Sequence, residues 1–387
     1  MKPILKWIAR GLGALVLAAL VVGFWKREEI LRLMAVNSLF AEEKIVGNFS
    51  HMDRAFLSRD IPRGDGPVSP LPAGPAATLP AATDQWIRDR SVTSLLVTHR
   101  GRIVYENYYL GTGPDDRRIG WSVSKSFLST LFGILKAEGA FPSLDAPVTQ
   151  FVPSLAGSAY DGVSLRNVLQ MTSGLDFDED YLDYDSDINK MGRVLALGGS
   201  MDGFAAGLRN RAAPPGEAWD YVSIDTHVLG MVIRGATGRD IPDLLSEKII
   251  RPLGLEADPY ILTDGNGVAF ALGGLNLTTR DYARFGLMVA QGGYWQGKQV
   301  VPADWIAAST IASAPTEPGN IRYGYQWWIP EDAPDGVFMA RGIYGQYIYI
   351  DQLRDVVIVT TGADRLFRDP GVNARNVAVF RAIAEAL

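Results

Sequence analysis

The sequence predicts an α/β fold of the α+β type, in which an antiparallel sheet takes its strands from both ends of the folded body. Residues 94–99 and 103–109 are rich in β-branched, aliphatic and aromatic side chains, and Arg100-Gly101-Arg102 between them is typical of a tight hairpin turn. Further strand-like runs lie near the C-terminus, at 323–328, 337–340, 347–350 and 356–361. The chain between the two groups has mainly helical patterns, so we expect helices to flank the sheet.

Composition and charge narrow the classes of function. The chain has 387 residues, 47% hydrophobic and 21% charged, which is ordinary for a globular protein of one large domain or two smaller ones. The formal net charge of −6 argues against a nucleic-acid partner, which requires a basic surface. Cysteine is absent, which excludes disulfides and thiolate metal sites, and the three histidines are far apart in sequence, which argues against a zinc site.

Residues 1–25 have the pattern of a membrane anchor or a signal segment. Three basic residues lead into the uncharged apolar run 11–25, which approaches the roughly 20 residues that a membrane-spanning helix needs. No small-x-small cleavage site follows directly after Trp25, so we favour an uncleaved transmembrane helix over a cleaved signal peptide. The basic N-terminus then lies on the cytoplasmic side, and the body is periplasmic, or secreted if the segment is cleaved.

Residues 26–82 are expected to connect this segment to a domain at 83–387. Their first half, about 28–48, is compatible with a helix that leads away from the membrane. Between residues 60 and 82 six prolines, together with glycines and alanines, predict an extended segment without helix. A short helix at 81–90 is expected to open the domain.

A Ser-x-x-Lys pair, Ser122 to Lys125, begins a run that predicts a buried helix. Apolar residues lie on nearly every side of this run, as in a helix without a solvent face, and Gly139 is a plausible C-terminal stop. Residues three apart are neighbours on one face of a helix, so the amine of Lys125 is expected to reach the hydroxyl of Ser122.

This pairing predicts acyl-transfer chemistry. A serine hydroxyl is a weak nucleophile until a base removes its proton, and a lysine acts as that base only when burial lowers its pKa. Ser122 is expected in the first helical turn, where free backbone N–H groups can hold an oxyanion. A Ser-x-x-Lys spacing alone occurs by chance in many helices, but an unpaired lysine in an apolar core is costly and therefore favours a functional role.

The middle of the chain adds two tyrosines to the candidates. Residues 163–175 predict a helix that ends at a glycine, and the acidic loop 176–187 that follows is either solvated or a lid over a site. Tyr221 precedes a helix whose N-cap is expected near Ser223 or Asp225, and by itself it fits a core position as well as a catalytic one. Two later helices are expected at 280–291, capped by Thr278 or Thr279, and at 373–387.

The order of these pieces, over about 83–387, resembles the serine β-lactamase and penicillin-binding superfamily. Ser122-x-x-Lys125 matches its first motif, and Tyr221-Val222-Ser223 matches its Tyr-x-Asn or Tyr-x-Ser motif. Gly342-Ile343-Tyr344-Gly345 stands where the third motif belongs, as in the class C-related branch of esterases and 6-aminohexanoate-dimer hydrolases. The resemblance implies a β-lactamase-like fold with an all-helical subdomain inserted between the N- and C-terminal strands.

The resemblance also implies roles for individual residues. The catalytic group is expected to be Ser122, Lys125 and Tyr221, acting through an acyl-enzyme on the serine. The backbone amides of Ser122 and Ile343 are expected to form the oxyanion hole. Substrate contacts are expected from Tyr181, Ser223, Gly342 and Tyr344. Neither a metal nor an organic cofactor is implied, and the partner is a small ester or amide.

Three departures from the superfamily pattern bear on the substrate. The Lys-Thr-Gly motif of true β-lactamases is missing, the second motif ends in Ser223 instead of asparagine, and no counterpart of the class A deacylating glutamate is found. These departures favour a carboxylesterase or a 6-aminohexanoate-oligomer-type amidase. The alternatives are a DD-peptidase or β-lactamase-like cell-wall enzyme, and a non-catalytic, membrane-tethered binding protein of the same fold. Acidic residues near Tyr181 hint at an amine-bearing substrate.

Overall fold

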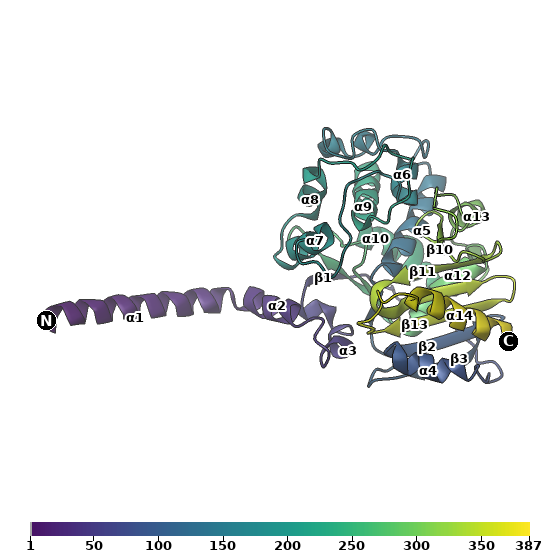
Figure 1. The fold of residues 1–387 in the computed structure, drawn as a ribbon, viewed down its shortest axis with the longest axis horizontal. Helices are drawn as coiled ribbons and strands as arrows, with labels where there is room; N and C mark the ends of the chain where they lie inside the picture. The colour runs from purple at the N-terminus through teal and green to yellow at the C-terminus, as the bar shows by residue number, and fades with distance from the viewer. Residues whose placement is uncertain (1) are drawn as a thin grey trace.

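The computed structural model describes residues 2–387 and shows a long N-terminal helix that leads into a folded body (Figure 1). Helix α1 (Lys2–Trp25) extends away from the body, and its segment Ile4–Trp25 is long and apolar enough to cross a membrane. The helix expected at 28–48 is broken into α2 (Arg27–Asn37) and α3 (Ile45–Asn48). Met1, the first residue of the expected anchor, lies outside the described residues, and the anchoring itself stays a prediction.

The main sheet joins the two ends of the body, as predicted. Its seven strands have the order β3-β2-β13-β12-β11-β10-β9, and every neighbouring pair is antiparallel. The bounds are β2 (Val92–His99), β3 (Arg102–Tyr108), β9 (Arg322–Tyr323), β10 (Trp328–Ile329), β11 (Val337–Gly342), β12 (Gln346–Asp351) and β13 (Val356–Gly362). The single strand predicted at 323–328 is wrong. Gln326 has a φ of 64°, which turns the chain so that β9 and β10 pair with each other.

Helices cover both faces of this sheet (Figure 1). Helices α4 (Ala82–Asp89) and α14 (Val372–Glu385) share one face, where Phe380 contacts the rings of Trp86 and Tyr347. Helices α5 (Val123–Ala137) and α12 (Thr279–Ala290) pack against the other face. A Cβ at Gly286 of α12 would lie 2.7 Å from Ile348, so glycine permits this close approach.

A helical part lies beside the sheet (Figure 1), and some of its residues line the candidate site. Its helices are α6 (Leu165–Gln170), α7 (Asp187–Ala196), α8 (Met201–Gly207), α9 (Ser223–Thr237) and α10 (Ile241–Leu245). Helix α6 ends at Met171, with a φ of 57°, and not at a glycine as expected. The N-cap of α9 is Val222, one residue before the expected range, and α7 and α8 were not predicted.

The remaining elements connect these two parts. A second sheet has the order β1-β5-β6-β4, with β1 (Leu57–Asp60), β4 (Arg118–Ile119), β5 (Tyr260–Thr263) and β6 (Leu275–Leu277). The shorter pieces are a π-helical turn (Ser246–Ile250), α11 (Arg251–Leu253), β7 (Tyr294–Trp295), β8 (Lys298–Gln299) and α13 (Ala303–Ser309). Single 3₁₀ turns lie at Met52–Arg54, Val148–Gln150, Pro153–Leu155 and Ile343–Gly345.

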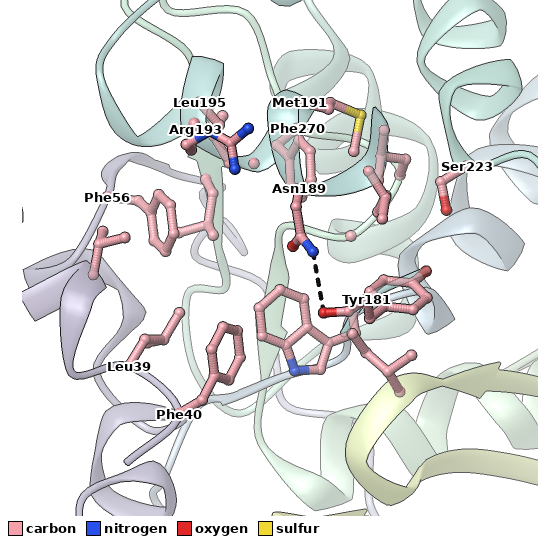
Figure 2. Close-up of a pocket in the computed structure, with 18 of the residues that line it drawn as sticks. Leu39, Phe40, Phe56, Tyr181, Asn189, Met191, Arg193, Leu195, Ser223 and Phe270 are labelled. Atoms are coloured by element: carbon pink, nitrogen blue, oxygen red, sulfur yellow. Dashed lines mark hydrogen bonds between the residues drawn. The ribbon is translucent and has the colours of Figure 1, made fainter. Parts of the chain in front are cut away.

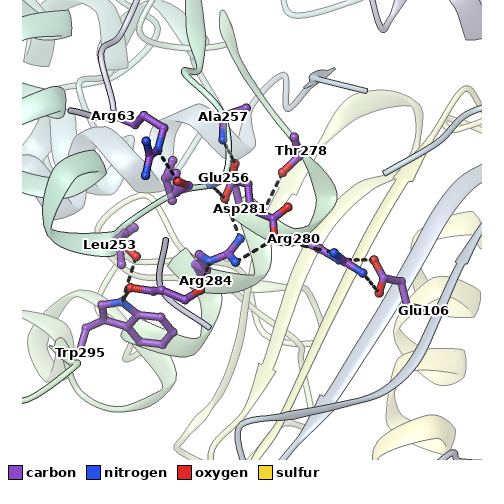
Figure 3. A network of polar contacts seen from close by, with 12 residues as sticks. Arg63, Glu106, Leu253, Glu256, Ala257, Thr278, Arg280, Asp281, Arg284 and Trp295 are labelled. Atoms are coloured by element: carbon purple, nitrogen blue, oxygen red, sulfur yellow. Dashed lines mark hydrogen bonds and ion pairs between the residues drawn. The ribbon is translucent and has the colours of Figure 1, made fainter. Parts of the chain in front are cut away.

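A buried ion network fixes α12 and the proline-rich segment to each other (Figure 3). The Arg284 side chain is 2% exposed and donates to Asp281 Oδ1 and Glu256 Oε1, both at 2.9 Å. Its Nε donates to the carbonyl of Ser69, also at 2.9 Å. Asp281 in turn accepts the backbone N–H of Glu256 at 2.9 Å. One carbonyl of the extended segment is therefore bound by a buried guanidinium, which helps to hold this segment in place without regular structure.

Substituting Arg284→Met is expected to lower the free energy of unfolding by about 3–5 kcal/mol, because it leaves the buried Asp281 carboxylate without its cation. Urea denaturation measures this change. The control is Arg59→Met, because Arg59 is 40% exposed and forms surface ion pairs with Asp240 and Asp243. Its loss is expected to cost no more than about 1 kcal/mol. Equal losses of unfolding free energy in the two variants would contradict the proposal that the buried network stabilises the fold more than a surface ion pair does.

Candidate active site

Ser122 lies at the turn between β4 and α5 and is the N-cap residue of α5. The preceding residue, Trp121, has a φ of 46°, a left-handed conformation that is strained for a large side chain. This turn directs the chain sharply from the small sheet into a buried helix. The Ser122 side chain is 9% exposed, at the inner end of a cavity. Such a position suits a nucleophile that must meet substrate with little surrounding water.

Lys125 lies one helical turn further on, as the spacing predicted. Its Nζ is 2.8 Å from Ser122 Oγ and 2.9 Å from the carbonyl oxygen of Leu272. The side chain is 1% exposed. Burial lowers the pKa of this amine to about 7, although the negative charge of Glu179 acts in the opposite direction. A large fraction of the lysine is therefore neutral at neutral pH and able to accept a proton.

Tyr221 completes the group from the loop before α9. Its ring centroid is 5.3 Å from Lys125 Nζ, and the ring packs on Trp328 at 4.8 Å. Burial raises the pKa of the hydroxyl well above its usual range, and hydrogen bonds with Ser122 and Ser223 oppose this only in part. The phenol therefore stays protonated at neutral pH. The structure thus brings together the three residues predicted to be catalytic.

The third motif reaches the nucleophile at the end of β11. A Cβ at Gly342 would lie 2.4 Å from the carbonyl oxygen of Gly120 and 3.2 Å from the amide nitrogen of Ser122. The chain then turns through Ile343 to Tyr344, which has a φ of 60°. Within residues 2–387, the amides of Ser122 and Ile343 donate to no backbone acceptor outside regular elements. Both amides therefore stay candidates for the predicted oxyanion hole.

A glutamate that the sequence analysis did not single out lies at the centre of the polar contacts. The Glu179 carboxylate accepts hydrogen bonds from the Ser223 hydroxyl, from the Ser223 N–H at 3.1 Å and from the Tyr181 hydroxyl at 2.7 Å. Burial raises the pKa of Glu179, and the charge of Lys125 lowers it. Tyr181 and Ser223, both predicted to contact substrate, are therefore positioned by one carboxylate.

Among the described residues that line the cavity there is no acidic side chain from loop 176–187. Asp180 pairs with Arg368 at 2.7 Å, Asp178 accepts the N–H of Asp180, and Asp187 pairs with Lys190. Asn189 fastens the loop by donating to the carbonyl of Tyr181 at 3.1 Å, as Figure 2 shows. The aspartates are thus used in holding the loop over the site. This arrangement gives no support to the expectation of an amine-bearing substrate.

The cavity beside Ser122 has a volume of about 510 Å³, within the usual range for small-molecule sites. Its polar end contains Ser122, Tyr181, Ser223, Ile343 and Tyr344. The rest of its wall is mainly apolar and comes from α7, from the Leu262–Leu272 region and from the segment that follows α1 (Figure 2). No sequence pattern predicted this last contribution.

Comparison with known proteins agrees with this geometry. Residues 83–381 match the family model described as Beta-lactamase. The chain is 34% identical over 310 residues to the 6-aminohexanoate-dimer hydrolase of Paenarthrobacter ureafaciens, covering 74% of this chain and 78% of the relative. It is 29% identical over 209 residues to Esterase EstB of Burkholderia gladioli, covering 46% of this chain and 50% of the esterase.

Solved structures place the fold in the same group. A proposed 6-aminohexanoate-dimer hydrolase from Bacillus anthracis superposes with a TM-score of 0.80 at 23% identity, covering 90% of this chain and 95% of the other. The predicted β-lactamase-like fold is therefore confirmed. Because the family model spans most of the chain and the similar proteins are hydrolases, the chain belongs to the beta-lactamase family and is a serine hydrolase of its esterase and amidase branch.

Proposed function

We propose that this protein hydrolyses a carboxylic ester or amide through an acyl-enzyme on Ser122, with Lys125 as the base and Tyr221 as the proton donor. One observation carries the proposal: a buried amine with a pKa of about 7 lies 2.8 Å from a serine hydroxyl that opens onto a cavity. The names of the two curated relatives, an amide hydrolase and an esterase, agree with both substrate classes.

The reaction begins when Ser122 Oγ attacks the carbonyl carbon and Lys125 takes the hydroxyl proton. The developing oxyanion is held by the amides of Ser122 and Ile343, whose positions next to each other follow from the approach of Gly342. Tyr221 donates its proton to the leaving alcohol or amine as the bond to carbon breaks, and Lys125 returns a proton to the phenol. Water then attacks the acyl-enzyme by the same route, and Ser122 is released.

Covalent labelling tests this assignment. The full chain is incubated with a fluorophosphonate, and intact mass is measured together with hydrolysis of p-nitrophenyl butyrate. We expect one adduct on the wild type and none on Ser122→Ala. The control is Ser126→Ala, because the Ser126 hydroxyl points away from the site and donates to the carbonyl of Gln326 at 2.8 Å. A label that persists in Ser122→Ala would overturn the assignment, and so would a wild type that neither labels nor hydrolyses.

The pH dependence gives a second check on Lys125. Its protonated form cannot accept the serine proton, so kcat/KM is expected to rise with pH and to reach half its maximum near pH 7. Because the charge of Glu179 raises the pKa of Lys125, Glu179→Gln is expected to move this midpoint to lower pH. Initial rates with an ester across pH 5–9 measure it (about two units either side of the midpoint).

The matched control for Glu179→Gln is Asp178→Asn, which neutralises an exposed carboxylate in the same loop. Its midpoint is expected to coincide with that of the wild type, since Asp178 makes no contact with Lys125 and salt screens exposed charges. A midpoint that moves to higher pH in Glu179→Gln would contradict the assignment of the acidic limb to Lys125.

A further inference from the structure

We propose that the cavity accepts the long aliphatic chain of an acyl ester or amide that reaches it from a lipid bilayer, along the segment that follows α1. This inference rests on the proposed hydrolase function and names its substrate class. It depends on three features: where the cavity wall comes from, what lines it, and how it is joined to the catalytic turn.

The wall facing the nucleophile is built by the chain that leaves the apolar helix. Three apolar residues of this chain line the cavity: Val36 near the end of α2, and Leu39 and Phe40 just after it. Only α2 separates them from α1. Helix α2 has 11 residues, which is about 16 Å at 1.5 Å per residue. Hence the end of the membrane-length helix at Trp25 and the cavity wall are separated by two to three times the thickness of a headgroup layer, which is roughly 5–8 Å on each side of the hydrocarbon core.

Helix α2 also carries exposed apolar side chains. Leu31 is 51% exposed and Met34 is 63% exposed, while Arg27, Arg32 and the pair Glu28-Glu29 lie on the same short helix. Exposed apolar side chains interleaved with arginines are typical of helices that lie in the membrane interface. Phe40, 42% exposed, stands where this surface meets the cavity. Exposed apolar side chains therefore lie on α1 and again on α2 beside the site, and the charged residues 26–29 separate the two groups.

The lining suits a hydrocarbon chain better than a charged substrate. Beyond the polar end, the wall consists largely of Phe56, Ile188, Met191, Leu195, Leu262 and Phe270. Among the described lining residues the one charged side chain is Arg193, whose guanidinium stacks 4.1 Å from the Tyr184 ring and donates to its carbonyl. No carboxylate lines the cavity to receive an amine. Each methylene buried against such a wall improves binding by roughly fourfold.

The segment after α2, which contains Phe40 and Phe49, packs against the turn that carries Ile343 and Tyr344. The Phe40 ring stacks on Tyr344, with centroids 5.2 Å apart and planes 14° from parallel, and Phe49 meets the same ring edge-on at 5.3 Å. Tyr344 follows Ile343, the residue whose amide is assigned to the oxyanion. A carbonyl held at Ser122 would thus place the attached chain between this aromatic clamp and α7, both of which line the cavity.

The test uses the full chain reconstituted in phosphatidylcholine vesicles, with p-nitrophenyl acetate, butyrate, octanoate and dodecanoate as substrates. We expect kcat/KM for dodecanoate to exceed that for acetate by at least about tenfold, since several methylenes are buried. Gly192→Phe is expected to reduce this ratio at least about tenfold. Gly192 lines the cavity on α7, and a Cβ there meets no atom within 4 Å, so the ring fills space that the chain would occupy.

The matched control is Gly207→Phe at the end of α8, where an added Cβ also meets no atom within 4 Å and which does not line the cavity. It is expected to keep the wild-type ratio. A wild-type ratio near one, or an equal fall in the two variants, would overturn the inference while Ser122 labelling and short-ester hydrolysis uphold the hydrolase. Absence of both labelling and hydrolysis of every ester would instead mean that the proposed function itself is wrong.

A second arm identifies the source of the substrate. p-Nitrophenyl hexadecanoate is placed either in the vesicles that carry the protein or in separate vesicles of the same composition. We expect several-fold faster hydrolysis when enzyme and ester share a bilayer. Equal rates would show that the chain reaches the cavity through water and would overturn the membrane route.

Discussion

Lys125→Met is expected to lower kcat/KM for ester hydrolysis by about 10³- to 10⁴-fold while making the folded protein more stable at neutral pH. The loss of activity follows because the amine 2.8 Å from Ser122 Oγ is the proposed base, and no histidine is among the described residues that line the cavity. Methionine has a similar length without a charge, so it fills the same space in the core.

The gain in stability follows from the sign of the pKa shift. The pKa of Lys125 is about 7 in the folded protein and 10.5 in the unfolded chain, so the unfolded state binds the proton more tightly. Stability therefore rises with pH between about 7 and 10.5, and below pH 7 the folded protein carries the full cost of the buried charge. Methionine removes this cost, so its advantage is greatest at pH 7 and below and disappears towards pH 10.5.

Urea denaturation at pH 6, 8 and 10 and steady-state kinetics measure both effects on the same samples (roughly one unit below, one above and three above the folded pKa). The control is Lys136→Met, near the end of the same helix, where the side chain is not part of the site. We expect it to leave both properties close to wild type. A Lys125→Met variant that loses stability at low pH, or keeps more than a tenth of the activity, would contradict the role of a buried, neutral base.

The local part of the site was predictable because it depends on helical geometry alone. Ser122 and Lys125 are three residues apart, and the apolar run around them required a buried helix, so their contact followed from the sequence. The strands β2, β11, β12 and β13 were predictable for a similar reason, since each contains a run of aliphatic, β-branched or aromatic residues. The position of Tyr221 could be assigned only through the family motif.

What the sequence did not predict depends on contacts between distant segments. Glu179 lies among six aspartates in the acidic loop 176–187, and only the approach of Ser223, 44 residues away, distinguishes it from them. The same limit applies to Phe40, whose stacking on Tyr344 joins residues from opposite ends of the chain. Local hydrophobic periodicity does not reveal contacts between residues that are so far apart in the sequence.

The two helices that were not predicted, α7 and α8, have recognisable N-cap residues in the sequence. Helices α7 and α8 each begin at a serine N-cap, because Ser186 accepts the N–H of Asn189 and Ser200 accepts the N–H of Gly203. In contrast, the turn within 323–328 had no such signal, since glutamine rarely adopts the left-handed conformation that Gln326 has. The side-chain amide of Gln326 donates to the carbonyls of Val168 and Leu169, both at 3.0 Å. These are tertiary contacts, which a local pattern does not reveal.

Gly342→Ala is expected to lower kcat by about 10²- to 10³-fold with a smaller change in KM. An added Cβ would lie 2.4 Å from the Gly120 carbonyl oxygen and 3.2 Å from the Ser122 amide nitrogen, and both are backbone atoms that cannot rotate away. The φ of Gly342 is −120°, which alanine adopts without strain, so the effect arises from the clash alone. Relief of that clash requires the end of β11, and with it the Ile343 amide, to move away from the nucleophile.

The division between kcat and KM distinguishes a displaced oxyanion donor from a general loss of structure. An oxyanion donor acts mainly in the transition state, so its displacement lowers kcat and leaves ground-state binding nearly intact. The control is Gly113→Ala, in the loop before β4, where an added Cβ meets no atom within 4 Å. A Gly342→Ala variant with near wild-type kcat would mean that the end of β11 does not supply the second donor. The amide of Ser122 would then have to stabilise the charge with another partner.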